Sequence, residues 1–133
     1  MPPDTTSLRS GTKHILIVED DAFLANAYRI KVEKAGYRVS MAADGEEALR
    51  LFQESPADLI LLDLVMPHMD GFTVLEKIRS MPKGKKTPIM VISNLEQDED
   101  LERAKRAGAN DYIVKSDIRL KDMLKKVSAL LQS

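Results

Sequence analysis

The sequence predicts an α/β fold built on an open, doubly wound sheet of five parallel strands. Short apolar segments alternate five times with segments whose apolar residues recur at helical spacing. The strand segments are apolar on both faces, which is typical of a parallel sheet covered by helices on both sides. Right-handed crossovers make such a sheet doubly wound. The 133 residues are too few for an eightfold barrel, which needs ~250 residues.

The first two strand–helix pairs are expected between the N-terminal region and Pro56. HILIVE at 14–19 and YRVSMA at 37–42 read as strands. The first helix is expected to end near Gly36, and Asp44 with Glu47 has the spacing of a capping box that opens the second helix. The inner faces of these two helices are expected to carry Phe23, Ala27, Ile30, Ala48, Leu51 and Phe52.

The remaining three pairs follow the same alternation. Helices are expected from Asp70 to Ser80, from 97 to 107 with Gly108 closing it, and from near Asp117 onwards. A basic loop rich in Pro and Gly, 81–88, separates the first of these helices from the next strand. The strands are expected at 58–63, 89–93 and 110–115. The inward residues are expected to be Phe72, Leu75, Ile78, Leu101, Ala104, Ala107, Leu120, Met123, Leu124, Val127 and Leu131.

The composition excludes several classes of site. There are no cysteines, so disulfides, thiolate chemistry and cysteine metal sites are absent. A net charge of −1 and two histidines favour neither nucleic-acid binding nor a histidine-rich metal site. No apolar run approaches the ~20 residues that span a bilayer, and residues 1–12 lack the apolar core of a secretory signal. We therefore expect a flexible tail at 1–12, one domain at 13–132 and a cytoplasmic location.

Polar residues stand where the predicted strands end, and open α/β sheets bind ligands beyond these carboxyl ends. Strand one ends in Glu19, Asp20 and Asp21, and strand three ends in Asp63. Strands four and five end in Ser93 and Lys115. Clustered carboxylates with a backbone carbonyl suit Mg²⁺, and a hydroxyl with an ammonium suits a phosphoryl group. The sequence thus predicts a site where a phosphoryl group meets an aspartate and a metal.

Four motifs in this order resemble the receiver domains of two-component response regulators, the CheY-like superfamily with its flavodoxin-like topology. They are ILIVEDD, LLDLVMPHMDG around Asp63, PIMVIS ending in Ser93, and AGANDYIVK ending in Lys115. Ser93 and Lys115 follow Asp63 by 30 and 52 residues, as the resemblance requires. It covers about residues 13–132, everything but the N-terminal tail.

The resemblance implies that Asp63 accepts a phosphoryl group from a sensor histidine kinase or a phosphotransfer protein. Mg²⁺ or Mn²⁺ would be held by Asp20, Asp63 and the backbone carbonyl of Val65, with Glu19 acting through water. Lys115 would pair with Asp63 and then with the phosphoryl oxygens. Such a domain is a switch and not a conventional enzyme, although it catalyses its own aspartyl phosphorylation and dephosphorylation.

The resemblance also implies a response to phosphorylation. Ser93 would donate a hydrogen bond to the phosphoryl group and move inward, and Tyr112 would fill the space. The surface of helix 97–107, strand 110–115 and the last helix would then bind an unknown downstream protein or a second copy of the chain. Binding to nucleic acid and insertion into a membrane are not expected.

Simpler roles remain open for several of these residues. An acid after strand one can cap the next helix, and Asp21 fits that role better than Asp20. Tyr112 can be an ordinary half-buried tyrosine in a strand. The charges at 96–100 and at Arg103, Lys105 and Arg106 are also typical of a solvated helix face. His68 fits an exposed loop better than a ligand position.

Two residues depart from the family pattern. Ser116 stands where the family usually has a proline with a cis peptide bond, so either a trans bond re-aims the start of the last helix or a strained cis bond persists. Ser116 is also expected to help cap that helix. Asn94 stands where a small residue is common, and its amide can orient or obstruct an attacking water, which leaves the lifetime of the phosphorylated state open.

Other functions fit the sequence less well. A phosphatase using an aspartyl-phosphate typically has a second Asp at the position of Val65, and a flavin module wants a Ser/Thr/Gly-rich loop where this chain has EDDAFL. A phosphate-independent pseudo-receiver would not need all of the acidic, hydroxyl and lysine positions. A receiver cut from a larger DNA-binding regulator stays open beside the leading interpretation, a stand-alone switch.

Overall fold

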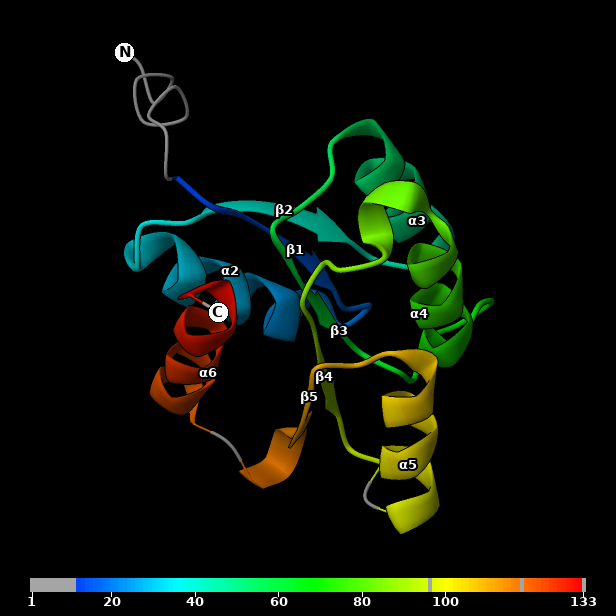
Figure 1. Ribbon diagram of the computed structural model, residues 1–133. Coiled ribbons are helices and arrows are strands. Elements are labelled where there is room, and N and C mark those ends of the chain that lie inside the picture. Colours follow the sequence, from blue (N-terminus) through cyan, green and yellow to red (C-terminus); the bar gives the residue numbers. More distant parts are fainter. Residues whose placement is uncertain (1–11, 96, 118, 133) are drawn as a thin grey trace.

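The computed structural model describes residues 12–95, 97–117 and 119–132. Its sheet has five parallel strands in the order β2-β1-β3-β4-β5 (Figure 1), which confirms the predicted fold class. The predicted flexible tail at 1–12 lies outside the described residues except for Thr12. The strands are β1 (His14–Val18), β2 (Arg38–Ala42), β3 (Leu59–Leu62), β4 (Ile89–Ser93) and β5 (Asp111–Val114).

The helices cover both faces of the sheet. Figure 1 shows α2 and α6 on one side and α3, α4 and α5 on the other. The α-helices are α2 (Ala22–Lys34), α3 (Gly45–Glu54), α4 (Gly71–Ser80), α5 (Asp98–Ala107) and α6 (Leu120–Gln132). Two short 3₁₀ helices are η1 (Pro82–Gly84), inside the segment predicted as a loop, and η2 (Lys115–Asp117). Among the residues that the structure describes, no helix combines the length and apolar character that a membrane span requires.

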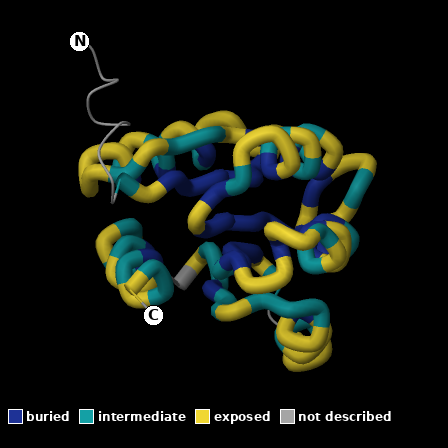
Figure 2. Tube along the Cα trace, turned by 45° about the horizontal axis from the view of Figure 1, so that its top comes forward, coloured by how far each residue is buried: buried dark blue, intermediate teal, exposed yellow. Residues whose placement is uncertain are grey.

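Alternating strand residues fill two cores because successive side chains point to opposite faces. Leu16 of β1 and Ile60 of β3 pack with α3 and α4, whereas Ile15 and Leu61 pack with α2 and α6. A smaller cluster under α5 contains Leu64, Phe72, Val91 and Ala104. The central strands are accordingly buried and the outer helix faces exposed (Figure 2).

The predicted helix starts are confirmed by their capping bonds. The Asp21 carboxylate accepts hydrogen bonds from the backbone N–H groups of Phe23 and Leu24 at 2.9 and 3.1 Å. Asp44 accepts from Glu47 N–H at 2.9 Å, and Asp70 caps α4 in the same way. These caps fix where α2, α3 and α4 begin, and α2 begins directly after the strand end that carries Glu19 and Asp20.

The predicted inner face of the first helix is wrong. Phe23 is 82% exposed and Ile30 is 42% exposed. The buried residues of α2 are instead Ala25, Tyr28 and Val32. The helix carries apolar side chains all around its own circumference, so helical spacing alone fits more than one buried face. The face with Tyr28 and Val32 is the one that packs over β1 and β3.

The last helix also begins later than predicted. The chain forms η2 from Lys115 and enters α6 only at Leu120. Every peptide bond between described residues is trans, so the Lys115–Ser116 bond takes the trans alternative. Ser116 lies four positions before the first residue of α6, too far away for the N-cap position. The expectation that Ser116 caps this helix is therefore not met.

Candidate functional site

Three carboxylates meet at the carboxyl edge of the sheet. One oxygen each from Glu19, Asp20 and Asp63 lies within 4.8 Å of the others. The backbone positions two of them, because Glu19 N–H donates to Ala42 O and Asp63 N–H donates to Val18 O, both at 3.0 Å. The neighbouring strands β1 and β3 therefore place acids 44 residues apart in the sequence side by side.

The three acids differ in their exposure. Asp20 is exposed, whereas Glu19 and Asp63 are each 4% exposed. The sequence predicts Asp63 at the carboxyl edge of the sheet, where ligands bind. Asp63 does follow the end of β3, and the residues around it enclose it. Asp21 faces away from this cluster into its helix cap, so the capping alternative applies to Asp21 and not to Asp20.

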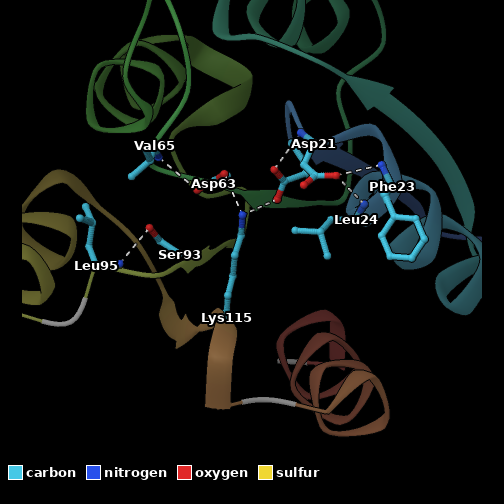
Figure 3. Close-up of polar contacts among 9 residues, drawn as sticks. Asp21, Phe23, Leu24, Asp63, Val65, Ser93, Leu95 and Lys115 are labelled. Atoms are coloured by element: carbon cyan, nitrogen blue, oxygen red, sulfur yellow. Dashed lines mark hydrogen bonds and ion pairs between the residues drawn. The ribbon is translucent and has the colours of Figure 1, made fainter.

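The Lys115 ammonium joins the two buried carboxylates. Its Nζ lies 3.0 Å from Asp63 Oδ2 (Figure 3). It also lies 2.8 Å from Glu19 Oε1. Burial opposes the charge of Lys115, but these two contacts outweigh it and raise the pKa of Lys115 to about 12. Burial raises the pKa of Glu19 to about 7 against the opposing effect of Lys115. The sequence predicted the Asp63 contact, whereas the Glu19 contact has no signal in sequence spacing.

The loop after β3 folds back around Asp63. Val65 N–H donates to Asp63 Oδ1 at 3.1 Å, while the Val65 side chain is 57% exposed. Gly71 closes the loop, since its N–H donates to Leu64 O at 2.8 Å. A Cβ atom on Gly71 would lie 2.4 Å from Leu64 Cα and 2.6 Å from Asp63 O. Only glycine allows α4 to approach the Asp63 backbone this closely.

Ser93 and Tyr112 come together through a third residue, Leu95. Ser93 is fully buried at the end of β4, and its Oγ accepts a hydrogen bond from Leu95 N–H at 3.3 Å. The Tyr112 hydroxyl donates to Leu95 O at 2.7 Å. Burial raises the pKa of Tyr112, so this phenol stays a hydrogen-bond donor. Asn94, between Ser93 and Leu95, is exposed.

The donor set fits a hard divalent cation. All three clustered ligands are carboxylates, which Mg²⁺ and Mn²⁺ prefer. Glu19 Oε1 is buried beside the Lys115 ammonium at 2.8 Å, and the exposed carboxylate of Asp20 lies next to it.

An open groove of about 630 Å³ adjoins the carboxylates. Glu19 and Asp20 line one end of it, and Phe23 and Met41 line its sides. Both of these apolar side chains are exposed. Of the three carboxylates, Glu19 and Asp20 therefore border a groove that is open to solvent at the start of α2.

The sequence matches the family model described as response regulator receiver domain over residues 15–128. A curated relative, the DNA-binding dual master transcriptional regulator RpaA of Synechocystis sp., is 36% identical over 118 residues, 89% of this chain. The chain spans only 48% of that relative's length. The fold and the matched residues agree, because the match runs from β1 into α6.

Two solved structures have the same fold. Chemotaxis protein CheY4 of Vibrio cholerae is 30% identical with a TM-score of 0.86, covering 90% of this chain and 99% of that one. The receiver domain of sensor histidine kinase PA1611 of Pseudomonas aeruginosa, solved with a magnesium ion in its active-site cleft, is 28% identical with a TM-score of 0.84. That match covers 92% of this chain and 100% of the other. The chain belongs to the response-regulator receiver domains, the phosphoryl-accepting switches of two-component signalling.

Proposed function

We propose that this chain is a phosphorylation-dependent signalling switch whose phosphoacceptor is Asp63. The phosphoryl group comes from a phosphohistidine of a sensor histidine kinase or a phosphotransfer protein. The observation that supports this most is the meeting of Lys115 with Asp63 at 3.0 Å, beside Glu19 and Asp20. An aspartate that only capped a turn would need neither a half-buried ammonium nor two further acids.

The transfer needs a nucleophile, a charge balance and a leaving group. A carboxylate oxygen of Asp63 attacks phosphorus, the P–N bond to the donor histidine breaks, and the leaving nitrogen takes a proton from solvent. The product is an acyl phosphate. Lys115 stays beside it and stabilises the phosphoryl oxygens that replace the free carboxylate. The structural support is that Lys115 already reaches Asp63 before any transfer.

Asp20, Asp63 and the Val65 carbonyl would hold Mg²⁺ or Mn²⁺, with Glu19 reaching it through water. When bound, the cation supplies positive charge to the phosphoryl oxygens. The three carboxylates and one ammonium leave the site with excess negative charge, which favours a divalent cation. The magnesium in the PA1611 receiver domain supports the same assignment here.

The switch would run from Ser93 to the surface of α5, β5 and α6. Ser93 donates its hydroxyl hydrogen to the phosphoryl group, and its Oγ then moves relative to Leu95. Because Tyr112 bonds to the Leu95 carbonyl, the same movement reaches β5. Exposed charges at Asp98, Arg103 and Lys105 make α5 the expected contact for a downstream protein or a second copy. Glu96, part of the same predicted face, lies outside the described residues.

The chain is proposed to act alone, as a domain at 13–132. The match to CheY4, which covers 99% of that protein, supports this. RpaA, of which the chain spans about half, supports a receiver within a longer DNA-binding regulator. An immunoblot of the source organism separates the two. A stand-alone protein runs at the 14.9 kDa of this chain, and a larger regulator runs well above it. If the chain is a stand-alone switch, we expect its downstream partner to be another protein.

Intact-mass spectrometry after incubation with acetyl phosphate and Mg²⁺ tests the switch chemistry. The expected result is a gain of one phosphoryl group that disappears in Asp63→Asn and without Mg²⁺. A folded, Mg²⁺-binding protein that gains nothing from acetyl phosphate or from phosphorylated kinases would instead support a phosphate-independent pseudo-receiver.

A further inference from the structure

Arg79, at the end of α4, binds three backbone carbonyl groups with its guanidinium. Its Nε and Nη2 donate to Gly108 O at 3.1 and 2.6 Å. Its Nη1 donates to Gly84 O at 2.7 Å and to Thr87 O at 2.6 Å. Nη2 also donates to Asn110 Oδ1 at 2.8 Å. One side chain therefore ties the last turn of α4 to the loop before β4 and to the segment between α5 and β5.

This guanidinium is committed to the backbone and not to an ion pair. Across the described part of the chain, no carboxylate lies within ion-pairing distance of Arg79. The side chain is half-buried, so its donors would be costly to leave without acceptors. The carbonyl of Gly108 is one of the unpaired groups at the end of α5, and Arg79 satisfies it.

The joint between α5 and β5 is shaped around this side chain. Gly108 has a φ of +111°, and a Cβ atom there would lie 2.7 Å from Arg79 Nε. Asn110 extends the joint to β4, because its Oδ1 accepts from Ile89 N–H and its N–H donates to Ile89 O, both at 2.8 Å. The C-terminal end of α5 is thus held by directed bonds from α4 and β4.

The other end of α5 is held differently. Its N-cap residue, Gln97, makes no side-chain capping bond. The segment before it is linked to the site through Leu95, which bonds to Ser93 and to Tyr112. Further along, Arg103 lies over the Phe72 ring at 4.0 Å, a contact that tolerates sliding. Figure 1 shows α5 below α4 on the same side of the sheet.

We propose that Arg79 pins the C-terminal end of α5, so that a change at Ser93 makes the helix swing at its N-terminal end about Gly108. The swing rests on the proposed phosphorylation switch, whereas the pin does not. The output surface would then change mainly around Asp98 and Arg103. The region around Asn110 would stay in place and keep the start of β5 in register.

Amide hydrogen exchange of the full chain, resolved by residue, tests the pin first without a phosphoryl donor. The reporters are the N–H groups of Gly108, Ala109 and Asn110, which are all hydrogen-bonded. In Arg79→Met their exchange should rise by about tenfold, while the amides of Glu102 and Arg103 change little. Arg50→Met is the matched control, since Arg50 is an exposed arginine paired with Glu54 on α3.

A second variant changes Gly108, whose carbonyl group accepts the bonds of Arg79. Gly108→Ala should push Arg79 away and raise exchange at the same amides, with an added effect from the strain of its φ of +111°. The double variant should therefore add little to Gly108→Ala alone. This outcome separates loss of the pin from general loss of stability. Unchanged exchange at 108–110 in folded Arg79→Met overturns the pin.

Acetyl phosphate with Mg²⁺ then tests the swing. In the unmutated chain, exchange should change at 98–103 and stay constant at 108–110, whereas in Arg79→Met the change should extend to 108–110. Equal changes at both ends of the unmutated chain overturn the swing. If the chain takes up no phosphoryl group, the swing falls with the proposed function, and the measurement without donor still decides the pin.

Discussion

Lys115 Nζ lies 3.0 Å from Asp63 Oδ2, and the same ammonium lies 2.8 Å from Glu19 Oε1. Both carboxylates are buried, so one cation balances two charges that would otherwise repel each other at close range. The site is therefore held together by a lysine before any metal or phosphoryl group arrives. This arrangement makes its stability and its chemistry depend on the same residue.

Lys115→Met should lower the free energy of unfolding by about 3 kcal/mol, because it leaves two buried carboxylates without their partner. Urea unfolding at neutral pH without Mg²⁺ measures this loss. Addition of Mg²⁺ should restore part of it, since a ligand that binds only the folded state stabilises that state. The same variant should also lose most of its phosphorylation by acetyl phosphate.

Lys126→Met serves as the control for this prediction. Lys126 pairs with Asp111 at 3.4 Å, but their side chains are 48% and 31% exposed. Its loss should cost about 0.5 kcal/mol or less. Equal costs for the two lysines would contradict a stabilising role for the buried pair.

Gly71→Ala should destabilise the protein by about 2 kcal/mol or more, because its Cβ would meet backbone atoms that cannot rotate away. The same clash displaces the loop that wraps Asp63, so phosphorylation should slow as well. Urea unfolding and intact-mass kinetics measure the two effects. Glu76→Ala, an exposed position on the same helix, should stay within about 0.5 kcal/mol. Normal phosphorylation of Gly71→Ala would show that the loop tolerates displacement.

His68→Gly should stabilise the protein by about 0.5–1 kcal/mol. His68 is exposed and has a φ of 70°, a conformation that costs energy for a residue with a Cβ atom and almost nothing for glycine. Thermal or urea unfolding detects the gain. Lys85→Gly, at an exposed position with a φ of −63°, should move stability in the opposite direction. A loss of stability in both variants would mean that the His68 side chain makes a compensating contact.

His14 should make stability fall in mild acid. Burial lowers the pKa of His14 from 6.5, the Arg38 guanidinium lowers it further, and Asp58 opposes them. The buried ring bonds to Ser40 Oγ at 2.7 Å, and a hydrogen bond with the Pro56 backbone also opposes the lowering of its pKa. The unfolded chain binds a proton at His14 near pH 6.5, whereas the folded chain does so only at lower pH. This contribution to stability is therefore fully present above pH 6.5 and is lost as the pH falls towards the lowered pKa of His14.

His14→Gln isolates this effect, because glutamine can still bond to Ser40 but does not titrate. The stability difference between the two proteins should shift as pH falls below about 6.5, with a slope of at most about 1.4 kcal/mol per pH unit. The raised pKa of Glu19 affects both proteins alike and cancels in the difference. Parallel profiles of stability against pH for the two proteins would contradict a lowered pKa of His14 as the cause.

The sequence predicts the sheet and its edge well for a physical reason. Buried parallel strands are short apolar runs, and their carboxyl ends must share one edge. The sequence therefore predicts that residues at four strand ends share that edge, and Glu19, Asp20, Asp63 and Lys115 do meet there. The caps at Asp21, Asp44 and Asp70 are equally predictable from the sequence, because each is a hydrogen bond between close neighbours in the chain.

Sequence patterns do not predict contacts that depend on how a helix is oriented or on backbone carbonyl groups. Apolar residues surround α2, so the burial of Tyr28 in place of Ile30 follows from packing against β1 and β3. The bonds of Arg79 go to carbonyl oxygens, which every residue has and no pattern marks. The meeting of Ser93 and Tyr112 at Leu95 has the same character. Long-range polar contacts to the backbone therefore need coordinates.

Chemical mapping of the phosphorylated residue tests the central claim most directly. The chain is phosphorylated by an autophosphorylated histidine kinase with Mg²⁺, reduced with borohydride and digested for peptide mass spectrometry. Borohydride cleaves an acyl phosphate and converts the aspartate that carried it to homoserine. The account predicts homoserine at position 63 and an unmodified Asp20. Homoserine at another position, or a phosphoryl group that resists borohydride, would contradict the assignment of Asp63 as the phosphoacceptor.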